Sequence, residues 1–325
     1  MLTLRHIEIF TMVCQEKSVT RAAERLHISQ PTVSAALKEI EEHYKQPLFD
    51  RQSHKLFINS FGLTIYDYAL RLLNLHADMI DAKASFDRIR IGTGTAIGKL
   101  FMPSVVKSFS ELHPNAKVTV SVGDASRMYS LAMENAVDFV IAETVDDIPG
   151  LAHRAIQSYP VVGICHRNNH LTEKKTVTAE DLINENLLLR EKGSSTRSIV
   201  DNYFQNHNLN VSPVWESYSV QTLLNATREG IGICFLSLDH VLAYASPDLI
   251  ILNIPDLQAE RFVNVSFHKD KLFSPLMKEF LIHYIRSTKQ TFESGIRQYN
   301  LRNPDASYRF QPYNASDFES DSLFR

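Results

Sequence analysis

The sequence predicts an α/β protein with an all-α N-terminal part. Three patterns predict this fold class. Apolar residues recur at helical spacing in short segments before residue 60, and a longer helical repeat follows over residues 61–87. From Arg88 onward, apolar runs typical of strands alternate with helical segments in two successive series. We therefore expect a small helical domain, one connecting helix and two α/β lobes.

The composition is that of an ordinary globular protein. The chain has 325 residues, 44% hydrophobic and 22% charged, and its formal net charge is 34 − 37 = −3, so composition alone does not indicate nucleic acid binding. Its apolar runs fall short of the ~18 residues of a membrane span, and its start lacks the apolar region of a signal peptide. Cys14, Cys165 and Cys234 form no CxxC pair. We expect a cytoplasmic protein with no membrane partner.

Residues 1–60 predict a helix-turn-helix followed by a two-stranded wing. Ser18 and Ser29 stand where a hydroxyl caps the second and third helices, and Pro31 falls in the first turn of the third. The connection at His27-Ile28 has the length that helix-turn-helix units use. Residues 47–58 predict the wing.

The third helix and the wing carry groups suited to DNA, because amides read base edges and basic side chains contact phosphates. The candidate DNA-binding residues are Ser29, Gln30, Pro31, Thr32, Ser34, Lys38, Arg51 and Lys55. Residues 1–60 contain eight Lys or Arg and seven Asp or Glu, so they have no general basic surface. A small helical domain that binds nothing is the alternative.

Residues Ala22–Ser34 (AAERLHISQPTVS) resemble the signature of LysR-type transcriptional regulators. The pattern continues at Ile40-Glu41-Glu42, Pro47-Leu48-Phe49, Arg51 and Gly62. Lys45 replaces a usual glycine, Asn59 a usual threonine, and Ala35 and Ala36 replace longer polar residues, which shifts sequence preference toward DNA shape. The resemblance, over about the first 290 residues, implies a transcriptional regulator that binds double-stranded promoter DNA, with RNA polymerase as a further partner.

Residues 61–87 predict a helix that pairs with another helix. The apolar positions that alternate in steps of three and four are Leu63, Tyr66, Leu70, Leu73, Ala77, Ile80 and Ala84. The stripe could instead pack on its own domain. Pairing suits a helix-turn-helix protein, because two copies bind two half-sites. The resemblance implies that this helix is a dimer linker and that the assembly is a homodimer or homotetramer.

The two α/β series have the order of parallel sheets covered by helices. The first places strands near 88–92, 117–122 and 137–142, with helices near 95–113 and 128–135. The second places strands near 161–166, 186–190, 211–217 and 231–236, with helices near 197–208 and 220–229. Ligands of such sheets bind beyond the carboxyl ends of the strands, at helix N-termini.

Hydroxyl-bearing helix starts at these strand ends form the candidate effector site, where N–H groups favour an anion. The candidate effector-binding residues are Thr95, Ala96, Ser126, Ser195, Thr196, Ser219 and Gln221. Each hydroxyl taken singly is equally well explained as a helix cap. The resemblance implies a two-lobed, periplasmic-binding-protein-like effector domain with its cleft between the lobes. We expect a small polar or anionic metabolite there.

Residues Leu189–Arg197 (LREKGSSTR) resemble the RE-x-GSGTR segment of LysR-type regulators of carbon and sulfur assimilation. Ser195 stands where that segment has a glycine, which would shrink the pocket or move its backbone. Glu143, which follows the strand at 138–142, fits the same subgroup.

Other sites are weaker candidates. The glycines of Gly92–Gly98 are spaced one residue too far for a dinucleotide fingerprint. His166 and His170 have the spacing of metal ligands on a helix but flank a turn-like stretch. Cys165 and Cys234 would make a redox switch, yet both sit in apolar strands. We expect no metal and no cofactor.

Two other function classes stay open: a solute-binding module, which the two lobes alone would suit, and a DNA-binding domain fused to a small-molecule enzyme. The sequence has no G-x-S-x-G elbow and no prominent acid pair, so we expect no catalytic residues. Residues 296–325 are rich in Asn, Ser, Asp and Pro toward their end and predict a mobile tail. The predicted divisions are 1–60, 61–87, 88–295 and 296–325.

Overall fold

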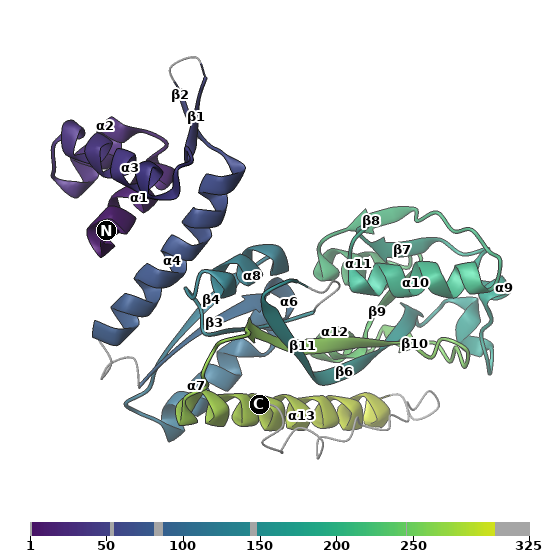
Figure 1. Ribbon diagram of the computed structural model, residues 1–325. Helices are drawn as coiled ribbons and strands as arrows, with labels where there is room; N and C mark the ends of the chain where they lie inside the picture. Colours follow the sequence, from purple (N-terminus) through teal and green to yellow (C-terminus); the bar gives the residue numbers. More distant parts are fainter. Residues whose placement is uncertain (1, 53–54, 81–86, 144–147, 245, 303–325) are drawn as a thin grey trace.

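The computed structural model describes residues 2–52, 55–80, 87–143, 148–244 and 246–302. Within the wing it describes the backbone of Arg51, Gln52 and Lys55 but not their side chains. Figure 1 shows a small helical unit, a long connecting helix and a two-lobed α/β part. The predicted fold class, α/β with an all-α N-terminal part, is confirmed.

The N-terminal unit is a helix-turn-helix with an antiparallel wing. Its elements are α1 (Leu4–Glu16), α2 (Val19–Leu26), α3 (Gln30–Tyr44), β1 (Phe49–Gln52) and β2 (Lys55–Ile58). The hydroxyls of Ser18 and Ser29 accept the backbone N–H groups of Arg21 and Thr32, so both predicted caps are confirmed. The helices pack around a buried cluster that includes Phe10.

Helix α4 (Ser60–Ile80) connects the wing to the α/β part (Figure 1). Its first turn lies so close to the wing that a Cβ atom on Gly62 would come within 2.2 Å of the Leu48 carbonyl oxygen. A side chain does not fit there, which explains the glycine in physical terms. The last predicted seam residue, Ala84, lies outside the described residues.

The exposed apolar stripe of α4 differs from the predicted seam. Tyr66 packs against the core of the helix-turn-helix, and Leu70 and Leu73 are partly buried. The large apolar side chains that are exposed on α4 are Leu63, Tyr68, Leu72, Leu75, Met79 and Ile80. Leu63 and Ile80 belong to both sets, and the other exposed residues each lie two positions after a predicted seam residue. The difference arises because α4 buries one face against its own chain.

The α/β part divides into two lobes, each with a parallel sheet. Lobe I contains β3 (Arg88–Gly94), α6 (Thr95–Leu100), α7 (Met102–Leu112), β4 (Lys117–Gly123), α8 (Ala125–Met133) and β5 (Phe139–Ala142). Lobe II contains η1 (His170–Glu173), α9 (Ala179–Leu182), β7 (Leu187–Arg190), α10 (Ser195–Asn206), β8 (Trp215–Ser217), α11 (Val220–Arg228), β9 (Ile233–Ser237) and α12 (Leu238–Ala243).

Two long antiparallel strands join the lobes. Strand β6 (Leu151–His166) pairs with β11 (Glu260–His268) over its first half and with β9 over Val161–Ile164. Strand β11 also pairs with β5 of lobe I. The strand order is therefore β4-β3-β5-β11-β6-β9-β7-β8, with β10 (Leu249–Ile251) also on β6. The expected strand near 161–166 is the second half of β6, and β11 was not expected.

Helix α13 (Pro275–Arg302) lies along one side of the α/β part (Figure 1). It continues beyond Gly295, so residues 296–302, predicted as part of the tail, are helical. The reason is packing: Ile296 lies against the main core, and the buried hydroxyl of Tyr299 accepts the backbone N–H of Ile251 at 2.8 Å. The rest of the predicted tail, 303–325, lies outside the described residues.

Candidate functional site

The face of α3 that points away from the core is exposed. Val33, Leu37 and Ile40 are buried, as their spacing predicts. On the other face, the exposed candidates are Ser29, Gln30, Pro31, Thr32, Ser34 and Lys38. An exposed helix face of small and polar groups has the shape that enters a DNA major groove.

Local contacts fix the start of this face. The Ser29 hydroxyl accepts the Thr32 N–H at 3.3 Å and lies 2.8 Å from the Thr32 hydroxyl. Lys38 lies 3.5 Å from Glu42, with both side chains mostly exposed, so this ion pair is weak and leaves Lys38 available. The side chains of Arg51 and Lys55 lie outside the described residues.

The lobe I candidates lie at carboxyl ends of parallel strands, as predicted. Thr95 begins α6 after β3, and its hydroxyl donates to the Gly123 carbonyl at the end of β4 (3.3 Å). Ser126 lies in the first turn of α8, and its hydroxyl donates to Asp124, the helix cap (2.6 Å). Ala96 is partly exposed beside Thr95. The two helix starts are therefore neighbours.

In lobe II the helix starts follow β7 and β8. Ser195 begins α10, next to the buried Thr196, and Ser219 caps α11 by accepting the Thr222 N–H at 3.3 Å. Gln221 donates to Asn225 within α11 (3.0 Å). For Ser219 the structure therefore shows the simple capping role that sequence reasoning left open, and Ser195 makes a different contact.

The Ser195 hydroxyl reaches across to lobe I, where it donates to the Glu143 carboxylate at 3.0 Å. Glu143 directly follows β5, and its other oxygen accepts from Arg261 of β11. Arg261 is buried, with a side chain 1% exposed, and also donates to Asp239 at 2.7 Å. Ser195, Glu143, Arg261 and Asp239 thus form one chain of contacts between the lobes.

In the sequence Glu143 stands out only as a subgroup marker, and Arg261 and Asp239 were not among the predicted site residues. Burial alone would raise the pKa of Asp239, but the positive charge of Arg261, together with contacts from His240 and Ser237, outweighs burial and holds that pKa well below its ordinary value. Asp239 is therefore charged at neutral pH. The sequence signal that could have revealed this pair is Arg261, an arginine within an apolar strand. A buried arginine needs a buried acidic partner.

A second ionic cluster joins lobe I to α4. Asp78 of α4 accepts from Arg88 (2.5 Å) and Arg90 (2.7 Å) of β3. Arg90 also donates to Asp138, which precedes β5 and accepts from Lys271 at 2.7 Å. Because α4 leads to the helix-turn-helix, this cluster attaches the connecting helix to lobe I.

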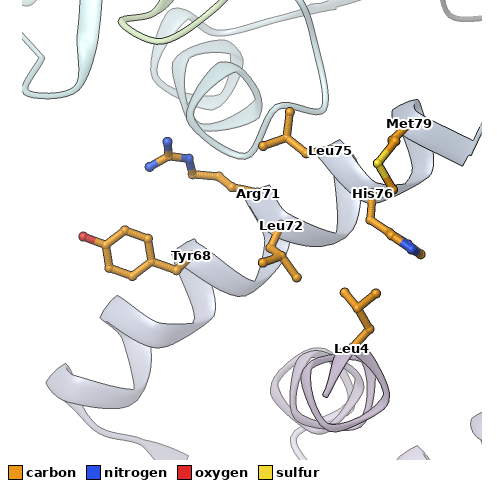
Figure 2. Close-up of a pocket in the computed structure, with 7 residues that line it drawn as sticks. All are labelled: Leu4, Tyr68, Arg71, Leu72, Leu75, His76 and Met79. Atoms are coloured by element: carbon orange, nitrogen blue, oxygen red, sulfur yellow. The ribbon is translucent and has the colours of Figure 1, made fainter. Parts of the chain in front are cut away.

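Figure 2 shows a pocket on the exposed side of α4. Six of its residues come from α4 and one from α1, and they are Leu4, Tyr68, Arg71, Leu72, Leu75, His76 and Met79. Most are apolar, and Tyr68, Leu75 and Met79 are 60%, 56% and 69% exposed. The pocket therefore lies within the exposed apolar stripe.

The weaker candidate sites gain no support. Ile164 pairs with Cys234, so the adjacent Cys165 faces the other side of the sheet, and the two thiols lie in different cores. Burial raises the pKa of Cys165 to about 12 and that of Cys234 further, which makes both thiols unreactive. His170 lies 3.5 Å from Glu185. Within the described ranges, no group of three or more His, Cys, Asp or Glu could hold a metal ion.

No helix in the described part of the chain is long and apolar enough to cross a membrane.

Comparison with known families gives two matches, which together span most of the chain. Residues 4–63 match the family described as "Bacterial regulatory helix-turn-helix protein, lysR family". Residues 83–288 match the family described as "LysR substrate binding domain". The two matches divide at α4, where the structure changes from the helical unit to the lobes.

Individual proteins are similar over nearly the whole chain. The transcriptional regulator CfxR of Cupriavidus necator is 27% identical over 89% of this chain and 93% of its own. A RuBisCO operon transcriptional regulator of Acidithiobacillus ferrooxidans is 26% identical over 90% and 96%. The full-length CbnR structure, complexed with its target DNA, has a TM-score of 0.62 at 19% identity and covers 88% of this chain and 100% of that one.

Proposed function

Because the chain belongs to the LysR family of transcriptional regulators, we propose that it binds a specific promoter sequence under the control of a small polar or anionic metabolite. The observation that carries the proposal is the pairing, in one chain, of an exposed α3 face with a two-lobed substrate-binding domain. Relatives that are named transcriptional regulators support the same role. We assign it no catalytic step and a place in the cytoplasm.

The proposed division of labour follows the elements. The helix-turn-helix unit binds DNA, helix α4 joins two chains, and the lobes from residue 88 receive the effector. α3 supplies base contacts through Gln30 and Ser34, and the wing supplies phosphate contacts through Arg51 and Lys55. Thr95, Ser126, Ser195 and Thr196 are the proposed effector contacts, because they begin helices at strand ends of both lobes.

The likeness to a RuBisCO operon regulator favours carbon over sulfur assimilation as the regulated process. Within that process we propose an anionic effector, because helix N-termini favour anions.

The proposal is tested by selecting a preferred sequence from random DNA with the full-length chain. Binding to that sequence is then measured with carboxylates, phosphorylated sugars, sulfur compounds and amino acids in turn. We expect one enriched sequence and at least one compound that changes its affinity. Enrichment of no sequence would contradict the proposal.

Gln30→Ala should weaken binding to the selected sequence by about tenfold, because a bidentate amide contact to a base is worth about 1–3 kcal/mol. Binding to random DNA should change far less. Gln46→Ala is the matched control, since Gln46 is an exposed glutamine just beyond α3. Equal losses on both DNAs would mean that Gln30 reads no base.

A further inference from the structure

Strand β5 connects the two ionic clusters of lobe I. It has four residues, all buried, and it pairs with β3 on one side and β11 on the other. Asp138 stands directly before it and Glu143 directly after it. A short strand held on both sides moves as a rigid unit, so a displacement of Glu143 also displaces Asp138.

The cluster at Glu143 has one permanent part and one part that can open. Arg261 and Asp239 have side chains only 1% exposed, and separating them would leave a buried charge without a partner. The Glu143 side chain is 24% exposed. Water or a ligand can therefore reach its carboxylate and compete with it for the Ser195 hydroxyl. Because Ser195 belongs to lobe II and Glu143 to lobe I, opening this contact removes one of the side-chain links between the lobes.

The cluster at Asp138 receives that movement. The side chain of Asp138 is 3% exposed and is held by Arg90 and Lys271, at 2.9 and 2.7 Å. Arg90 binds Asp78 of α4 through the same terminal nitrogen that contacts Asp138. Asn74 of α4 adds a hydrogen bond to the Glu134 carbonyl at 2.6 Å. A shift of Asp138 therefore pulls on α4.

We propose that Ser195, Glu143 and Arg261 form a latch between the lobes, and that β5 transmits the state of the latch to α4 through Asp138, Arg90 and Asp78. The proposal rests on the proposed function, since it names the regulation of the same effector site. A ligand that binds between the lobes acts by replacing the Ser195–Glu143 contact, and the orientation of α4 changes with it. Such a change alters the spacing of two helix-turn-helix units along DNA.

The latch is tested first without DNA or ligand, by the distance between two spin labels in the full-length chain. Exposed Glu111→Cys on α7 and Asn202→Cys on α10 carry the labels, in a Cys14→Ser background and diluted with unlabelled chain. Glu143→Ala should lengthen or broaden the distance distribution, and Ser195→Ala should do so to a smaller extent. Glu216→Ala is the control, because it removes a comparable contact to Arg197 within lobe II (2.7 Å).

An unchanged distance in both Glu143→Ala and Ser195→Ala would overturn the latch. Ser195→Ala deletes a single hydroxyl, so it tests the latch even if Glu143→Ala does not fold.

Transmission is tested on the DNA sequence that the wild-type chain selects. Glu143→Ala should change its affinity by about fivefold or more, the lower end of usual allosteric coupling. In an Asp78→Asn background the same substitution should still change the lobe distance but leave the affinity unaltered. If Glu143→Ala and Asp78→Asn change the affinity for this DNA independently and additively, the proposal of transmission through β5 is overturned.

The failures are distinguishable. If the wild-type chain selects no sequence, the proposed function fails while the spin-label distance still decides whether the latch exists. If a sequence is selected but the distance does not respond, the latch fails and the proposed function stands.

Discussion

Lys45 ends α3 in the left-handed region of backbone space, with φ of 53°. A side chain there costs about 1 kcal/mol, which glycine avoids. We therefore expect Lys45→Gly to raise the free energy of unfolding of the helix-turn-helix by about 1 kcal/mol, as measured by urea denaturation. Lys38→Gly is the control, because glycine in the middle of a helix should lower that free energy by a similar amount. Equal destabilisation by both would refute the argument.

Asp138 connects pH to stability. Burial alone would raise its pKa, but hydrogen bonds and charge from Arg90 and Lys271 outweigh burial and lower the pKa below its ordinary value. The unfolded-state pKa is about 3.9. The ionised group therefore contributes fully above that pH, and its contribution disappears as the pH falls through the lower, folded-state pKa.

Asp138→Asn should accordingly lower the free energy of unfolding at pH 7 by about 3 kcal/mol, the cost of breaking a buried ion pair. The difference from wild type should shrink once the pH is below about 4. Asp270→Asn serves as control, because Asp270 is 83% exposed and 3.7 Å from Arg71, where a pair contributes little. A pH-independent difference for Asp138→Asn would contradict the assignment.

Roles that depend on near neighbours in the chain could be predicted from the sequence, and roles that depend on tertiary contacts could not. Ser18 and Ser29 cap helices that begin at the next residue, so the signal lies within a few positions. Glu143 and Arg261 meet although they are 118 positions apart. Their pairing depends on β11 lying beside β5, which no local pattern encodes.

At the scale of elements, α4 combines an attached face with an exposed apolar stripe, which is what a dimer helix requires. Leu75→Asp should raise the dimer dissociation constant by about tenfold or more, since a charge would enter the centre of the interface. Sedimentation equilibrium measures the change. Leu112→Asp is the control, since Leu112 is 67% exposed on α7. An unaltered dissociation constant for Leu75→Asp would place the interface elsewhere.

Most helices and parallel strands of both lobes lie where the alternating apolar pattern predicts them. Helices α9 and α12 were not expected, and the helix expected near 95–113 divides into α6 and α7 at Phe101. The first half of β6 and all of β11 were not predicted from that pattern. They form an antiparallel pair although all of lobe II lies between them in the chain, and Arg154 and Arg261 interrupt their apolar runs. The end of α13 was not predicted for another reason. Tyr299 is held there by a tertiary contact to Ile251, which helical periodicity does not indicate.

At the scale of the whole molecule, the shared strands should make the two lobes unfold together. Phe204 is fully buried in the lobe II core, and Phe204→Ala should cost about 4 kcal/mol. We expect faster amide hydrogen exchange in β7 and β9 of lobe II and, through β6 and β11, in β3 of lobe I. Exchange in α1–α3 is the internal control and should not change. Protection retained in β3 would show that the lobes unfold independently.

The position of β11 in the sheet also governs how the protein is made. Strand β11 lies between β5 and β6 in the sheet but begins only at Glu260. The ribosome therefore synthesises it after both of its neighbours. Until the ribosome has released that segment, β5 and the first half of β6 present open edges, and Glu143 and Asp239 lack the arginine that separates their charges. Lobe I therefore cannot be completed during translation of its own residues. Chaperones that shield strand edges would act on this nascent chain while lobe II is being synthesised, until β11 emerges.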